Sequence, residues 1–109
     1  MKIVDISNTG ARGWFVGKFP EAAIYSEHFE LCYTTWPAGK IEPHYHSEST
    51  EAILVISGSC VVNEQHVNAG EMYILEPGDI NDSDFLEESV VLGIKFPAGA
   101  DDKIKLIDN

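Results

Sequence analysis

The sequence predicts one all-β domain, a sandwich or barrel of short antiparallel strands. Segments rich in β-branched and aromatic residues alternate apolar and polar side chains, Gly and Pro interrupt them every several residues, and no segment has convincing helical periodicity. The 109 residues suffice for one domain with one core and are too few for two. We therefore interpret residues 1–109 as a single domain, with its core at about residues 29–96.

The first twenty-six residues contain two expected strands. Residues 2–6 alternate polar and apolar side chains and end at a turn-rich segment, and residues 14–16 form a second short apolar run. Residues 20–26 have a faintly helical composition that is too short to matter. Three aromatic side chains give this region an exposed apolar surface, which a second copy could cover: Trp14, Phe15 and Phe19. We therefore expect a homodimer, with residues 2–19 at its interface.

The rest of the chain alternates strands and turns. The expected strands are residues 29–36, 52–56, 60–62, 72–75 and 90–96, with a last apolar alternation at Ile104, Leu106 and Ile107. Residues 57–59 and 63–65 read as tight turns, and Pro77-Gly78-Asp79 suits a type II turn. The polar segment from Asn81 to Phe85 is expected to cross between sheets. In such a fold one face of each strand lines the interior, so a pocket at one end is natural.

The charge balance limits the partners. There are 18 acidic residues against 7 basic ones, a formal charge of −11. Phosphate backbones and anionic membrane surfaces would repel such a chain, so we expect neither nucleic-acid nor membrane partners. Asp5 and Ser7 interrupt the N-terminus before it reaches signal-peptide length, and no window approaches a membrane span. We expect a cytoplasmic, acidic protein whose partner is a small-molecule ligand or substrate.

The two cysteines, Cys32 and Cys60, lack the short spacing of a zinc knuckle or a thioredoxin-like motif. A disulfide remains open, but the simpler interpretation is two small buried residues in strands.

The segment from His44 to Glu51 carries the strongest chemical signal. His44 and His46 point to the same side of an extended backbone, because strand side chains alternate faces. Glu51 can return beside them if the polar residues 47–50 form a bend. Two neutral imidazoles and one carboxylate make a facial triad that suits Fe(II) and tolerates Mn, Ni, Cu or Zn.

The spacing of these residues resembles the first motif of the cupin superfamily. That motif is a glycine, five residues, His-x-His, three or four residues, glutamate, six residues and a glycine. Gly39, the two histidines, Glu51 and Gly58 match it, with four residues instead of five after the first glycine. In the second motif, Gly70 and the Pro77-Gly78 turn are kept.

The second motif also departs from the cupin pattern. Glu76 stands where its proline would be, Asn81 where the third histidine would be, and Phe85 where its asparagine would be. Asn81 is thus the candidate fourth ligand, a neutral and weaker donor than imidazole. Asp79 and Asp82 could replace it, although an extended backbone sends them away from the pocket.

The resemblance covers roughly residues 29–96 and implies a double-stranded β-helix, or jelly-roll, barrel. It implies a metal site at His44, His46, Glu51 and Asn81, holding a divalent transition metal. One hypothesis is a mononuclear metal-dependent enzyme, dioxygenase-like or isomerase-like, that acts on a small polar organic molecule. The alternative is a non-catalytic sugar-binding or ligand-binding sensor whose metal is weak or absent. The fold does not choose between them.

Other side chains near the motifs have two interpretations each. Four could line the pocket or simply form core: Tyr33, Trp36, Cys60 and Tyr73. Tyr45 should face away from the ligands, and His28 and His66 should be surface residues. The acidic cluster of Asp79, Asp82, Asp84, Glu87 and Glu88 is interpreted as a solvated face. The sequence places no acid or base beside the site, and it cannot place Arg12, Lys18, Lys40 or Lys95.

Overall fold

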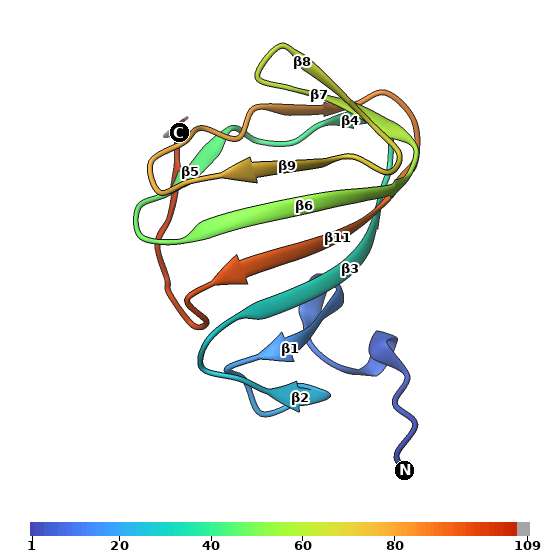
Figure 1. Cartoon of the computed structure of the whole chain (residues 1–109), viewed down its shortest axis with the longest axis vertical. Helices are drawn as coiled ribbons and strands as arrows, with labels where there is room; N and C mark the ends of the chain where they lie inside the picture. Colours follow the sequence, from blue (N-terminus) through green and yellow to red (C-terminus); the bar gives the residue numbers. More distant parts are fainter. Residues whose placement is uncertain (107–109) are drawn as a thin grey trace.

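A computed structural model describes residues 1–106, which fold into two main β-sheets and a two-stranded pair (Figure 1). The described residues contain two helices, the 3-10 turns Ile6–Asn8 and Ala11–Gly13. Neither has the length or the apolar character needed to cross a membrane. The chain is therefore nearly all β, as its sequence predicts.

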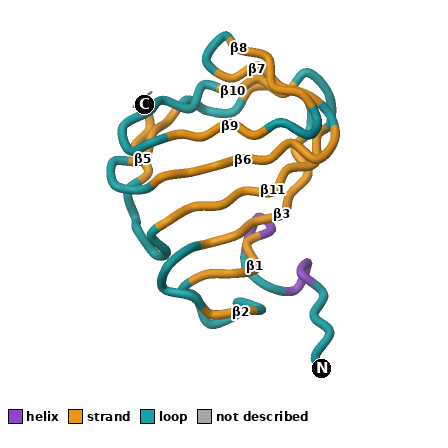
Figure 2. The backbone as a smooth tube through the Cα atoms, in the orientation of Figure 1, coloured by secondary structure: helices purple, strands orange, loops and turns teal. Residues whose placement is uncertain are grey.

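The larger sheet has six strands. Their bounds are β1 Trp14–Gly17, β2 Ile24–Tyr25, β3 Glu30–Trp36, β6 Thr50–Ser57, β9 Met72–Leu75 and β11 Ser89–Phe96. They lie in the order β2-β1-β3-β11-β6-β9 (Figure 2), antiparallel except for the β1–β2 pair. The two longest strands, β6 and β11, pair with each other beside β3 and make the firm centre of this sheet.

The second sheet has four strands, in the order β4-β10-β7-β8. Their bounds are β4 Gly39–Lys40, β7 Ser59–Val62, β8 Gln65–Asn68 and β10 Ser83–Phe85. A separate antiparallel pair joins β5 His44–His46 to β12 Lys103–Lys105. A single β-bridge between His44 and Asn81 connects β5 to the chain that leads into β10. Both cupin-like motifs are therefore neighbours in space.

The core lies between the two main sheets. Its buried cluster contains Val55, Cys60, Val62, Val67, Phe85 and Val91. Trp36 stacks on Phe85 with ring centroids 6.2 Å apart, which extends this apolar cluster towards β3. Phe85, at the motif position of an asparagine, is a core residue with 2% exposure.

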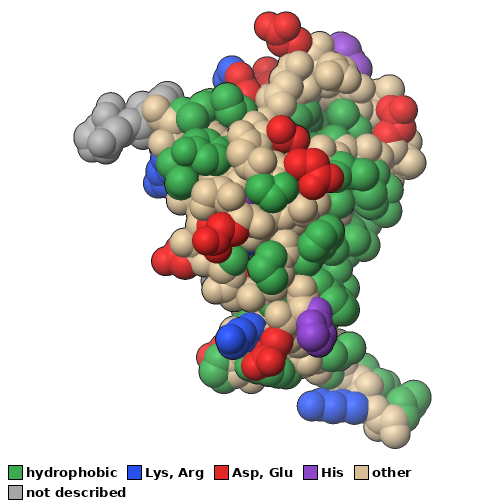
Figure 3. Space-filling model, turned by 60° about the vertical axis from the view of Figure 1, so that its left-hand side comes forward, with side chains coloured by type: hydrophobic (Ala, Val, Ile, Leu, Met, Phe, Trp, Pro, Cys, Tyr) green, Lys and Arg blue, Asp and Glu red, His purple; other side chains and the backbone are tan. Residues whose placement is uncertain are grey.

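The charged residues of the three central strands of the six-stranded sheet lie on its inner face, beside the core. Its inner face carries Glu30, Glu51 and Lys95, which lie in register across β3, β6 and β11. The outer face is uncharged and consists of Leu31, Tyr33, Thr35, Ala52, Leu54, Ile56, Met72, Ile74, Val90, Leu92 and Ile94. Hydrophobic side chains run down the right-hand flank of the molecule in Figure 3. Ile74 is 58% exposed on this face.

Most of the predicted strands are present, and three details are corrected. Residues 2–6 form no strand, because this segment has no neighbouring strand to pair with, and residue 6 begins a 3-10 turn. Residues 20–26 contain the short strand β2 in place of a helical turn. The segment from Asn81 to Phe85 is partly a strand, β10, inside the second sheet. The alternation predicted near the end is seen as β12, and Ile107 lies outside the described residues.

The N-terminal aromatics also differ from expectation. Trp14, Phe15 and Phe19 are half-buried, not an exposed surface. Trp14 and Phe19 line the main cavity, and Trp14 pairs with the cavity-lining Cys32 across β1 and β3. A broad apolar surface lies on the outer face of the six-stranded sheet, and the N-terminal region exposes Ile3 and, in β2, Ile24.

Candidate metal centre

A cavity of about 590 Å³ opens on the inner face of the six-stranded sheet. Side chains from β3, β5, β6 and β11 line it, together with the segment that precedes β12. His44, His46, Glu51 and Asn81 all contribute to its wall. A smaller hollow of about 350 Å³ lies along β8 and β9 and contains none of these four residues. The larger cavity is therefore the candidate site.

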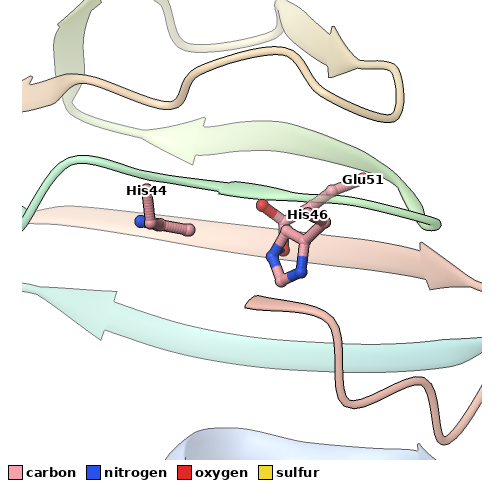
Figure 4. A group of neighbouring side chains, drawn as sticks. All are labelled: His44, His46 and Glu51. Carbon is pink, nitrogen blue, oxygen red and sulfur yellow. Dashed lines mark ion pairs between the residues drawn. The ribbon is translucent and has the colours of Figure 1, made fainter. Parts of the chain in front are cut away.

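His44, His46 and Glu51 come together as the sequence predicts (Figure 4). One donor atom from each lies within 4.8 Å of the other two, and among the described residues no other three His, Cys, Asp or Glu side chains group in this way. The bend at residues 47–48 returns the chain from β5 to β6, which brings Glu51 back beside the imidazoles. The two rings meet edge to face, with centroids 5.5 Å apart.

The tautomer of His44 is fixed by its neighbour. Nδ1 lies 2.9 Å from the carbonyl oxygen of Glu42. A carbonyl oxygen only accepts, so Nδ1 carries the proton and Nε2 keeps its lone pair. The ring is 7% exposed, and this burial lowers the pKa of His44. His44 is therefore neutral at neutral pH, the form that binds a metal.

His46 is held in the same way by a carboxylate. Its Nδ1 lies 3.1 Å from Oδ1 of Asp102, and its Nε2 lies 3.8 Å from Oε2 of Glu51. Hydrogen bonding to an ionised carboxylate places the proton on Nδ1. In both histidines Nε2 therefore keeps its lone pair, and that of His46 lies beside Glu51.

Asp102 is the main site residue that the sequence did not reveal. It is 6% exposed, and its Oδ2 accepts hydrogen bonds from the backbone amides of Glu48 and Ser49 at 2.8 and 2.7 Å. Burial alone would raise the pKa of Asp102, but hydrogen bonds from Glu48, Ser49 and His46 outweigh it and hold that pKa below its usual range. Asp102 lies fifty-six positions from His46, without a motif to mark it.

Lys95 supplies the positive charge that balances Asp102. Its Nζ lies 3.5 Å from Oδ1 of Asp102 and 3.8 Å from Oε1 of Glu30, and it donates to the carbonyl of Ala100 at 2.9 Å. Lys95 is 8% exposed and lines the cavity. A buried lysine needs such partners because an unpaired charge is costly to bury. Acidic and basic groups therefore do lie beside the histidines, although none could be placed from sequence.

Asn81 lies at the site, but its side chain has another partner. It is 4% exposed, and its backbone exchanges hydrogen bonds with His44 at 2.7 and 3.2 Å. Its Oδ1 accepts a hydrogen bond from the hydroxyl of Ser83. Asn81 therefore stands in the expected place, and its role as a ligand stays a prediction.

The predicted pocket aromatics divide by strand face. Trp36 and Tyr73 line the cavity, whereas Tyr33 lies on the outer face and Cys60 is in the core. Burial raises the pKa of Tyr73. Both cysteines are free, and Cys32 faces the cavity beside Gly93, where an added Cβ would come within 2.7 Å of its Sγ. This close approach explains why a glycine stands at position 93.

Most of the other residues singled out in the sequence lie outside the cavity. His28 and His66 are exposed, as expected. Tyr45 pairs with Ile104 across β5 and β12 and does not line the cavity. The same holds for every member of the acidic cluster, Asp79, Asp82, Asp84, Glu87 and Glu88. Arg12 lines the cavity, and Lys40 lies 3.6 Å from Asp82.

The three donor atoms suit one divalent ion. Zn²⁺ and similar ions take nitrogen and oxygen donors at about 2.0–2.2 Å, so donors on one ion lie roughly 3–4 Å apart. A spacing within 4.8 Å needs only small side-chain adjustments to reach that range. Each imidazole already has the partner on Nδ1 that metal-binding histidines use.

The sequence matches no protein-family model and no curated protein, but the fold matches many solved structures. An uncharacterised protein with a double-stranded β-helix domain from Klebsiella pneumoniae aligns over 99% of both chains, with a TM-score of 0.70 and 16% identity. An RmlC-like cupin from Shewanella frigidimarina has a TM-score of 0.62 and 16% identity, over 70% of this chain and 72% of that chain.

A third similar structure is a metalloenzyme. Oxalate decarboxylase from Bacillus subtilis, with Mn(II) centres, has a TM-score of 0.63 and 17% identity, over 74% of this chain and 25% of that chain. At such identities the likeness establishes the fold alone. It confirms the double-stranded β-helix predicted from the two motifs.

Proposed function

We propose that this chain, a small cupin domain, binds a divalent transition metal through Nε2 of His44, Nε2 of His46 and a carboxylate oxygen of Glu51. The observation that carries the proposal is that each Nδ1 is occupied by an acceptor, which leaves the Nε2 lone pair of each ring free, while one donor atom each from His44, His46 and Glu51 lie within 4.8 Å of one another. Oxalate decarboxylase, which shares the fold, has Mn(II) centres, and this supports the choice of a metal.

A bound divalent ion would polarise an oxygen atom of a small polar organic molecule. The chain itself supplies the surroundings of that molecule. The cavity wall offers apolar contact through Trp36, Tyr73 and Ile53. The carboxylate of Glu51 would balance part of the charge of the metal ion. Lys95 and Asp102 supply polar groups beside the histidines, and they pair with each other. Because a metal ion in this cavity could act on a bound organic molecule, we propose a metal-dependent enzyme, dioxygenase-like or isomerase-like.

Asn81 favours the second candidate, a non-catalytic binding cupin. Its side-chain oxygen accepts a hydrogen bond from Ser83, and an amide is a weaker ligand than the imidazole of the cupin pattern. A site with only three strong ligands, where the cupin pattern has four, would hold its metal more loosely and could serve in ligand sensing.

Metal content measured by mass spectrometry, on protein purified without chelator, tests the proposal. We expect stoichiometric metal in the unaltered chain and loss of it in His44→Ala and Glu51→Gln. His66→Ala is the matched control, because His66 is exposed and outside the cavity, and it should keep its metal. Metal retained equally by all variants, or absent from the unaltered protein, would contradict the proposal. Turnover of candidate substrates by the loaded protein then separates the enzyme from the sensor.

A homodimer is proposed as well, through a different surface from the one expected. The outer face of the six-stranded sheet is uncharged on a chain of net charge −11. A second copy can approach there without bringing like charges together, and one sheet face can pack on its own copy about a two-fold axis.

A further inference from the structure

We infer that Asp102 is the positioning residue of this site: its carboxylate sets the tautomer of His46 and so decides which ring nitrogen is available to the metal. The effect on metal binding rests on the proposed function. The tautomer of His46 does not, because it follows from the hydrogen bonds of Asp102. It assigns a role to the segment between β11 and β12, which neither cupin-like motif includes.

The two oxygens of Asp102 have separate tasks. Oδ2 receives two backbone amides, those of Glu48 and Ser49, at 2.8 and 2.7 Å. Both donors are fixed by the main chain, so the group placed there must accept. Oδ1 is thereby directed at Nδ1 of His46, at 3.1 Å, with Nζ of Lys95 at 3.5 Å. The backbone carbonyl of Asp102 also accepts from the amide of Ser47 at 3.1 Å.

Through these contacts Asp102 connects three parts of the site: the bend between β5 and β6, the ring of His46, and Lys95. It holds the bend between β5 and β6 through three consecutive amides, those of residues 47, 48 and 49. It also ties this bend to His46 on β5 and to Lys95 on β11. Because the bend is what returns Glu51 to the histidines, Asp102 acts on the ring and on the bend together.

Asp102→Asn distinguishes this role from simple packing. The asparagine oxygen must face the two amides of the bend, because they require an acceptor. Its NH2 group is then directed at Nδ1 of His46, which can pair with it only by accepting. The proton therefore moves to Nε2, the nitrogen that would bind the metal. A variant with nearly unchanged shape is predicted to invert the tautomer.

The matched control is Asp101→Asn. Asp101 also lines the cavity, is exposed, and loses the same charge on substitution. It has none of the contacts to His46, so its variant should keep the tautomer of the unaltered chain. Thermal unfolding of both variants shows whether each is folded under the conditions used.

The experiment is nitrogen-15 NMR of the imidazole rings in metal-free protein, with His46 assigned by comparison with His46→Gln. We expect the Nδ1–H tautomer in the unaltered chain and in Asp101→Asn, and the Nε2–H tautomer in Asp102→Asn. Finding Nε2–H in the unaltered chain overturns the inference even if Asp102→Asn fails to fold. An unchanged tautomer in folded Asp102→Asn overturns it as well.

Titration with Zn²⁺ against a competing chelator gives the second readout. Loss of a carboxylate that orients a metal-binding histidine typically weakens metal affinity about 10–100-fold, and we expect a loss of this size for Asp102→Asn and little change for Asp101→Asn. If the unaltered protein binds no metal, the proposed function fails, while the NMR result still decides the role of Asp102. If the metal binds equally in both variants, the positioning role is wrong and the metal site stands.

Discussion

Asn81 occupies the place of the third histidine of the cupin pattern, and its side chain already has a partner. It lies beside His44 through two backbone hydrogen bonds, yet its side-chain oxygen accepts from Ser83. We predict that Asn81→His binds metal more tightly than the unaltered chain, because a third imidazole joins the ligand set. Chelator competition with Zn²⁺ measures the change. Unaltered affinity would show that the side chain at position 81 does not face the ion.

Ser83→Ala is the companion to that variant. It removes the hydroxyl that engages Asn81 and leaves the asparagine in place. If the Asn81 oxygen can bind the ion, freeing it should tighten binding as well, though by less than the histidine does. A weaker site in Ser83→Ala would instead show that Ser83 orients Asn81 usefully.

Cys32 gives a test that depends on pH. Burial raises the pKa of its thiol to about 11, helped by the negative charges of Glu51 and Glu30. We expect slow alkylation by iodoacetamide at pH 8, increasing towards pH 11, followed for each cysteine peptide by mass spectrometry. Rapid alkylation of Cys32 at pH 8 would contradict this burial.

The same shift affects stability. Above the ordinary pKa of 9.0 the unfolded chain loses the Cys32 proton while the folded chain keeps it. The unfolded state then binds fewer protons, so the contribution of this group to the unfolding free energy is present below pH 9 and is lost as the pH rises towards about 11.

At the residue scale, the sequence identified the candidate ligands but not the residues that hold their side chains in place. Strand periodicity and a bend explain why the spacing of His44, His46 and Glu51 brings these residues together. Asp102 and Lys95 have no such pattern, because their contacts depend on how the last segment returns across β5 and β11. Only the tertiary structure brings these distant residues together.

At the scale of elements, Gly58 forms the turn between β6, in the six-stranded sheet, and β7, in the second sheet. Its φ is +90°, and an added Cβ would collide with the Ser89 hydroxyl and lie 2.8 Å from the Glu88 carbonyl oxygen. Gly70 has a similar φ of +87°, but nothing lies within 4 Å of its Cβ position. An alanine at position 70 would add backbone strain alone, whereas an alanine at position 58 would add both strain and steric collision.

We predict that Gly70→Ala costs about 1 kcal/mol, because it adds only the strain of a left-handed backbone. Gly58→Ala should cost about 1–3 kcal/mol more, because crowding adds to that strain. Chemical denaturation of both variants measures the difference. Equal losses would mean that Ser89 and Glu88 move aside freely.

Strand prediction succeeded where an apolar run is bounded on both sides by clear turn residues. The runs at residues 72–75 and 90–96 appear as β9 and most of β11. Residues 2–6 have the same alternation but no partner strand, so the pattern alone did not make a strand. The face of each strand was harder to predict, because the charged residues of β3, β6 and β11 point inwards.

At the scale of the whole molecule, the uncharged outer face is the surface on which a second copy is proposed to pack. We predict that the unaltered chain sediments as a dimer and that Ile74→Lys, on this face, sediments as a monomer. Ile80→Lys is the control, since Ile80 is 44% exposed but lies in the loop after β9. It should remain dimeric, and a monomeric unaltered chain would exclude the dimer.

The contact between Gly93 and Cys32 has a consequence for how such a cavity can change. Cys32 and Gly93 are paired across β3 and β11, and both line the cavity without belonging to the candidate ligand set. Exchanging the pair together, with an alanine at each position, would redistribute volume along the cavity wall and leave His44, His46 and Glu51 untouched. The shape of the cavity can therefore be changed without substituting any of the three candidate ligands.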